Sequence, residues 1–140
     1  MRDYIIMSKD KLKKYQEFVD QVTSKYSKDS DDFIERLKYI ENNNIKVSRL
    51  ITAGVGLSGE IGEFNEIIKK IVFQEKPITN DTTDHLKKEL GDVMWYIAQA
   101  CIALQTDMQT IVDINEEKLK KRFGGSSFDS MDEDEGTFYD

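Results

Sequence analysis

The most constraining feature of this 140-residue chain is one short pattern that occurs twice, at residues 57–64 and 86–93. Each copy reads leucine, two residues, glutamate, an apolar residue, glycine, an acidic residue and an apolar residue. At about 100° per residue on a helix, each copy belongs to an apolar stripe. The stripes consist of Leu57, Ile61, Phe64, Ile68 and Ile71 in the first, and Leu86, Leu90, Val93, Ile97 and Leu104 in the second. Both copies therefore predict long amphipathic helices.

Four carboxylates occupy matching places in these two helices. Glu60 and Glu89 fall inside the stripes, and Glu63 and Asp92 lie at their edges, because residues three apart are neighbours on a helix. The linker at 75–81 is short, so the helices should be antiparallel neighbours and the acid pairs should meet. A buried carboxylate is costly unless it is paired or binds a metal. The sequence therefore predicts a cation site.

The expected ligands are all oxygen atoms, because neither pattern contains cysteine or histidine. Such a set favours Mg²⁺ first and Mn²⁺ as a substitute. A di-iron bundle would require Glu-x-x-His on two helices, whereas His85 stands four residues before Glu89. The competing interpretation is a pair of solvated helix faces, since charged residues make up 34% of the chain. The metal site is favoured because the two acid pairs take the same positions relative to the apolar stripes of their helices.

Gly62 and Gly91 stand in the middle of both predicted helices. Glycine in a helix interior costs about 1 kcal/mol relative to alanine, so the missing side chain should serve a purpose. We expect close approach either of a neighbouring helix or of a bulky ligand around the metal.

The rest of the chain also has helical periodicity, and no segment predicts a strand. The first expected helix is amphipathic, starts after Ser8 and includes Tyr26, and a short second helix runs from Ser30 to 42–44. The third is expected at 47–74 and the fourth from Thr82 or Thr83 to Leu104. The fifth should start at a Thr106–Gln109 capping box and end at the glycines at 124–125. We expect an all-α fold: a four-helix core with the short helix as an insertion after the first. Trp95 lies opposite its helix's stripe, so either a partner subunit or the inserted helix should cover it.

Composition excludes several classes of protein. The single cysteine, Cys101, cannot form an internal disulfide and should be a small core residue. No apolar run is long enough for a signal peptide or a membrane span, so a cytoplasmic protein with no membrane partner is expected. The net charge is −7, but residues 126–140 contain six acidic and no basic residues. The body is nearly neutral, so no nucleic-acid partner is expected.

The spacing of Glu60 and Glu63, then Glu89 and Asp92 after twenty-five intervening residues, resembles the signature of the MazG-like nucleoside triphosphate pyrophosphohydrolases. That family belongs to an all-α superfamily, which also contains dimeric dUTPases and phosphoribosyl-ATP pyrophosphohydrolase. Further similar blocks follow in family order, at 56–63, 69–70, 89–96 and 115–123. The resemblance implies a MazG-like bundle at 1–125. The acidic composition of residues 126–140 predicts a flexible tail there. The resemblance also implies a homodimer or homotetramer.

The resemblance further implies Mg²⁺-dependent hydrolysis of nucleoside triphosphates, with dNTPs favoured, to nucleoside monophosphate and pyrophosphate. The implied metal ligands and catalytic residues are Glu60, Glu63, Glu89 and Asp92, one of which would also take a proton from water. The implied substrate-binding residues are Lys118, Arg122, Asn115, Lys69 and His85. Of these, Lys118 and Arg122 match the family's phosphate-binding basic pair, and His85 stands where relatives carry a basic residue.

Two alternatives remain open at this point. One is a catalytically silent helical module for oligomerisation or regulation that has kept the fold. Its mark would be a broken acid quartet or a lost basic pair, and both are intact. The other is a pyrophosphohydrolase for a different substrate, such as phosphoribosyl-ATP.

Overall fold

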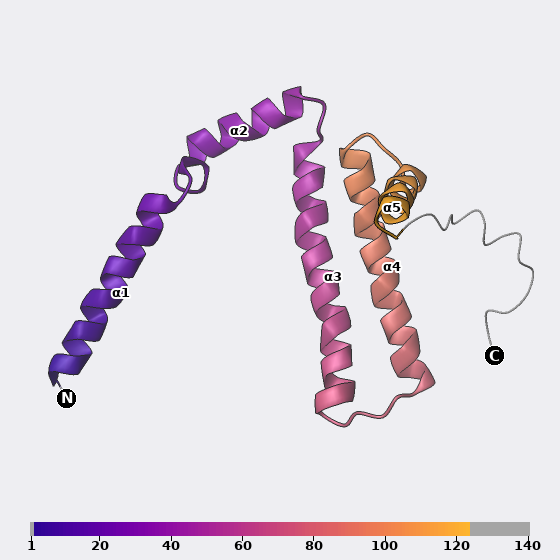
Figure 1. The fold of residues 1–140 in the computed structure, drawn as a ribbon, viewed down its shortest axis with the longest axis horizontal. Helices are drawn as coiled ribbons and strands as arrows, with labels where there is room; N and C mark the ends of the chain where they lie inside the picture. Colours follow the sequence, from indigo (N-terminus) through magenta and orange to yellow (C-terminus); the bar gives the residue numbers. More distant parts are fainter. Residues whose placement is uncertain (1, 124–140) are drawn as a thin grey trace, which may run out of the picture. The chain divides into compact units, whose positions relative to one another are not determined.

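The computed structural model describes residues 2–123, with side chains from 10 to 122. Its elements in chain order are α1 (Arg2–Val22), the 3₁₀ helix η1 (Lys25–Ser27), α2 (Ser30–Asn42), α3 (Val47–Phe73), α4 (Asn80–Ala103) and α5 (Met108–Phe123) (Figure 1). No strand occurs in this described range, which confirms the all-α prediction. The expected glycine stop at 124–125 and the expected flexible tail at 126–140 lie outside the described residues.

The chain divides between Asn43 and Asn44 into two compact units. The first contains α1, η1 and α2. Its first helix begins before Ser8, at Arg2, and ends at Val22 rather than extending to Tyr26. The early end has a local cause, because the hydroxyl of Ser24 accepts a hydrogen bond from the Tyr26 amide and starts the 3₁₀ turn instead.

Helix α2 begins at Ser30, as the sequence predicts. The Asp29 carboxylate caps it by accepting hydrogen bonds of 2.9 Å from the amides of Asp31 and Asp32. The helix ends at Asn42, within the asparagine run where its end is expected.

The second unit is built on α3 and α4, which run antiparallel side by side (Figure 1). Helix α3 ends because Glu75 adopts a positive φ of 53° and the Lys70 carbonyl accepts the amides of Gln74 and Lys76, both at 3.2 Å. Helix α4 begins at Asn80, slightly before the expected Thr82 or Thr83, because the Thr79 hydroxyl caps it by accepting the Thr82 amide. The hairpin geometry predicted from the short linker is confirmed.

Polar contacts fasten the other end of the hairpin. The Lys46 amide donates to the Ala103 carbonyl at 2.9 Å, and the Arg49 guanidinium donates to the Gln99 side-chain oxygen at 2.7 Å. The capping box expected at Thr106 is wrong. Asp107 caps α5 instead, through a 2.7 Å hydrogen bond from the Thr110 amide, and α5 then contacts α4.

Close packing of α3 on α4 occurs at Gly56. A Cβ atom there would lie 2.0 Å from a ring carbon of Tyr96, so only glycine leaves room for that ring. Nothing among the described residues comes within 4 Å of a Cβ built at Gly62 or Gly91. No described helix of this chain therefore approaches these two glycines, and the other expectation, a ligand around the metal, stays a prediction.

The strip of α3 that meets α4 is not centred on the predicted stripe. Ala53 is buried, and Gly56 contacts Tyr96, whereas Ile61 and Leu90 of the predicted stripes are each 50% exposed. Residues 53, 56 and 60 share one helix face. Glu60 therefore belongs to the contact strip itself, and much of the remaining apolar surface lies outside the hairpin seam. Cys101 is buried, which confirms its place in the core.

Candidate metal centre

Three carboxylates from the two acid pairs converge between α3 and α4. One oxygen each from Glu60, Glu63 and Glu89 lies within 4.8 Å of the other two. The first two are one turn apart on α3, and Glu89 faces them from α4, as the antiparallel hairpin requires. Glu63 is exposed, Glu60 is half-buried and Glu89 is only 5% exposed. The cluster therefore runs from solvent into the seam between the helices.

The electrostatics of Glu60 reflect this crowding. Partial burial raises the pKa of its carboxyl above the ordinary value of 4.5, and the charges of Glu63, Asp92 and Glu89 raise it further. Every charged group that shifts this pKa is another carboxylate. Asp92 is exposed and outside the group of three, yet its charge acts on the same site.

Glu89 has one specific partner, which is the side chain of His85. The imidazole Nε2 lies 3.0 Å from Glu89 Oε1, one helical turn away on α4. The resemblance gave His85 a phosphate-binding role, whereas the structure shows its ring against the buried carboxylate. The i, i+4 spacing was the signal in the sequence that could have revealed this contact.

The donor set fits a hard divalent cation. Carboxylate oxygens are the ligands that Mg²⁺ and Mn²⁺ prefer, and such ions keep waters or phosphate oxygens on their open side. Waters or phosphate oxygens could reach a bound ion from the exposed side of the cluster, near Glu63 and Gly62. A cation would also relieve the repulsion among the carboxylates. The cluster can therefore hold a metal ion.

The remaining predicted substrate-binding residues lie on α3 and α5. Lys69 forms an ion pair with Glu66 on its own helix, and Lys70 shares the same carboxylate at 3.7 Å. Three further predicted residues are exposed on α5, namely Asn115, Lys118 and Arg122. Their helix contacts α4, the helix that carries Glu89 and Asp92.

A cavity of about 430 Å³ adjoins the cluster on the side of the hairpin tip. It lies between the end of α3, the 74–79 loop and the first turns of α4. Its lining includes Ile67, Ile71, Pro77, Lys70, Lys76 and His85. Because His85 also contacts Glu89, the cavity and the carboxylates are neighbours. Sequence reasoning missed this cavity, since it is formed by a loop and two helix ends together.

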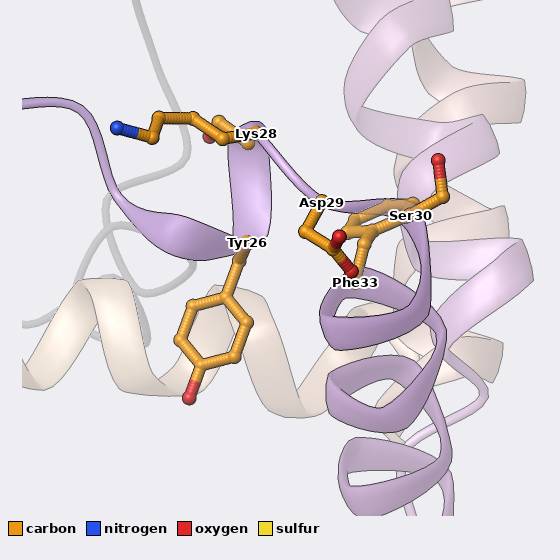
Figure 2. Close-up of a pocket in the computed structure, with 6 residues that line it drawn as sticks. Tyr26, Lys28, Asp29, Ser30 and Phe33 are labelled. Atoms are coloured by element: carbon orange, nitrogen blue, oxygen red, sulfur yellow. The ribbon is translucent and has the colours of Figure 1, made fainter. Parts of the chain in front are cut away.

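A second cavity, of about 360 Å³, lies in the first unit at the start of α2 (Figure 2). Tyr26, Lys28, Asp29, Ser30 and Phe33 line it. The Asp29 carboxylate there already accepts two backbone amides of α2. The Asp29 carboxylate is therefore engaged in capping α2, and no cluster of metal-ligating side chains lines this cavity.

The all-α fold and the carboxylates that converge on an antiparallel helix pair place the chain in a class of helical proteins with an acidic site that could hold a cation. More specifically, the chain belongs to the MazG nucleotide pyrophosphohydrolase domain family, whose family model matches residues 50–124. The matched range contains all four carboxylates, nearly all of α3, and the whole of α4 and α5. The family resemblance noted from the sequence is thereby confirmed.

Among curated proteins, the chain is similar to the Gene 37 protein of Mycobacterium phage L5, with 42% identity over 69 residues. The match covers 49% of this chain and 60% of that relative's length. No solved structure matches the chain significantly. Within residues 2–123, no helix combines the length and apolar character needed to cross a membrane.

Proposed function

We propose that the protein is a Mg²⁺-dependent nucleoside triphosphate pyrophosphohydrolase that converts dNTPs to nucleoside monophosphate and pyrophosphate. The observation that carries this proposal is the convergence of Glu60, Glu63 and Glu89 within the family-matched region, with the charge of Asp92 acting on the same site. Mn²⁺ should substitute for Mg²⁺, because both accept all-oxygen ligands.

The carboxylates divide two tasks between them in the proposed reaction. The metal, when bound, neutralises phosphate oxygens and activates water for attack on the α-phosphorus. Glu89, held by His85, and Glu63 and Asp92 on the exposed side fix the position of the cation. Glu60 is our candidate for the proton acceptor, because it belongs to the first acid pair and lies half-buried among the carboxylates that would hold the metal.

Basic residues on α5 complete the proposed substrate contacts. Lys118 and Arg122 are four residues apart, so they share a helix face and can grip the same triphosphate. Asn115 lies on that face and is assigned to the ribose, base or phosphate. Lys69 is assigned a peripheral phosphate contact, since Glu66 already pairs with it.

We further propose that the chain acts as a homodimer or homotetramer. Large apolar side chains of the hairpin are not covered within the second unit, including Trp95, which is 54% exposed, and Val55, which is 71% exposed. Exposed apolar surface of this kind marks protein contact sites. A second copy of the same hairpin is the proposed cover for it.

The deciding experiment is product identification on a substrate panel. The purified chain is incubated with each dNTP, each NTP and phosphoribosyl-ATP, with Mg²⁺ or with EDTA. We expect monophosphate and pyrophosphate from dNTPs in Mg²⁺ and neither product in EDTA. Release of orthophosphate with diphosphate would show cleavage of a different bond, and turnover of phosphoribosyl-ATP alone would assign the other substrate class. A catalytically silent module would process none of them.

A further inference from the structure

The cavity at the hairpin tip has the size and position of a ligand subsite. Its volume of about 430 Å³ falls within the range of roughly 300–1,000 Å³ that small-molecule sites occupy. His85 forms part of its lining, and the same imidazole lies 3.0 Å from Glu89. A ligand in this cavity would therefore sit directly beside the carboxylate cluster.

The cavity wall continues the helix face that carries the acids. On α3, Ile67 follows Glu63 by four residues and Ile71 follows by eight, so these side chains extend the same face toward the tip. At 1.5 Å per residue, the two isoleucines lie about 6 and 12 Å along the axis from Glu63. A single nucleoside attached to a phosphate at the carboxylates has the reach to occupy this space.

The wall combines an apolar part with polar and charged groups. Ile67, Ile71 and Pro77 provide the apolar surface, and Asp81 lines the cavity together with the basic side chains. The nearby hydroxyls of Thr79 and Thr82 lie 2.9 Å apart, and Thr82 donates to the Pro77 carbonyl, so these polar groups are largely satisfied within the loop. Such surfaces bind flat, weakly polar groups, whereas the triphosphate belongs with the cation at the acidic end.

We propose that this cavity binds the nucleoside part of the substrate, with the base against Ile67, Ile71 and Pro77. Lys70 and Lys76 also line the cavity, where their ammonium groups can meet polar edges of the ligand. This inference rests on the proposed function, because it assigns the phosphates of the same molecule to the carboxylate cluster.

Methyl NMR of the full-length chain tests the placement directly. Isoleucine δ1 methyl groups are labelled with ¹³C, and non-hydrolysable α,β-imido-dNTPs are added with Mg²⁺. We expect intermolecular NOEs from base protons to Ile67 and Ile71. Inorganic triphosphate with Mg²⁺, which lacks a base, should leave the Ile71 methyl resonance unchanged.

The outcomes separate this inference from the proposed function. If dNTPs are hydrolysed to pyrophosphate but base NOEs reach only other methyl groups, the cavity assignment is overturned and the activity stands. If the active-site assay and Mg²⁺-dependent nucleotide binding both fail, the proposed function falls and the inference falls with it.

A cavity-filling variant provides a matched kinetic test. Ile71→Trp should raise KM for dNTPs by at least about tenfold, while Mn²⁺ affinity, measured by EPR, stays unchanged. Val72→Trp is the control, because Val72 neighbours Ile71 on α3 but is 58% exposed and outside the cavity. Equal KM values for the two variants would contradict the proposal. Should Ile71→Trp misfold by circular dichroism, the NOEs of the wild-type chain decide alone.

Discussion

At the residue scale, the metal-free site is held together against electrostatic repulsion. Glu60 lies among three other carboxylates, and both burial and those charges raise its pKa. A carboxyl whose folded-state pKa is raised binds protons more tightly when folded, so stability falls as pH rises through the window above 4.5. The convergence of these carboxylates therefore lowers stability, and a cation bound among them would offset that cost.

We therefore expect Glu60→Gln to raise Tm of the metal-free protein at pH 7, with the gain vanishing as pH falls below about 4.5. Glu66→Gln is the matched control on the same helix. Its pKa is lowered by a hydrogen bond from Lys69 and by the charges of Lys69 and Lys70, so its removal should lower Tm at pH 7. Thermal unfolding in EDTA across pH measures both, and the same sign for the two variants would contradict the assignment.

Turnover should depend on the acids that the cation would bind. Glu63→Gln and Asp92→Asn each remove a negative charge with little change in size. We expect each to lower kcat/KM by at least about 10²-fold, while circular dichroism shows the helical fold intact. Asp84→Asn is the control and should retain activity, because Asp84 shares α4 with Asp92 but forms an ion pair with Lys87. Full activity of both acid variants would place the metal elsewhere.

At the element scale, the α3–α4 hairpin positions the carboxylates, and Gly56 sets how closely the two helices approach. Tyr96 occupies the space that a Cβ at this position would need. Gly54 stands on the same helix with nothing among the described residues within 4 Å of a built Cβ. A substitution at Gly56 therefore tests packing against Tyr96, whereas one at Gly54 tests helix propensity alone.

Gly56→Ala should destabilise the protein by about 1–3 kcal/mol, because the Tyr96 ring must move out of its position. Gly54→Ala should instead stabilise it by up to about 1 kcal/mol, as expected for alanine in an open helix interior. Denaturant unfolding gives both values. If both substitutions stabilised the protein equally, the Tyr96 ring would be able to move away from position 56 at no cost in stability.

Helix α5 contributes the proposed phosphate contacts. Lys118→Ala and Arg122→Ala should each lower kcat/KM about 10- to 100-fold for every nucleotide alike, because the phosphates are common to all substrates. Asn115→Ala should instead change the ranking among nucleotides if its amide reads sugar or base. Kinetics on the dNTP panel separates these roles, and altered base preference in the Lys118 variant without weaker binding would overturn its phosphate assignment.

At the scale of the whole molecule, the chain contains two compact units, and only the second carries the acid cluster and the family match. The acidic charge lies largely outside this unit's described part, at 126–140. Deleting residues 126–140 should therefore leave turnover and oligomer size nearly unchanged. Light scattering and dNTP kinetics on the truncated chain measure both, and a collapse of turnover would assign the segment to the site.

Local signals in the sequence determined most of the helices. Apolar periodicity and polar caps gave the all-α fold, and the short linker gave the antiparallel hairpin. The four acids were identified because their spacing repeats in both helices. The predicted ends of the helices were less accurate, because neighbouring residues can each cap the same helix. At α5, for example, Asp107 is the cap rather than the predicted Thr106.

Only the tertiary structure decided which face of each helix forms the seam. Periodicity identifies an apolar stripe but not the part that a particular neighbour covers, so Ile61 and Leu90 proved half exposed while Glu89 proved buried. The contact between His85 and Glu89, the role of Gly56 and the cavity at the hairpin tip also depend on how the elements meet. Spacing along one chain fixes which residues share a helix face, whereas the rotation of two packed helices depends on side-chain fit across the seam.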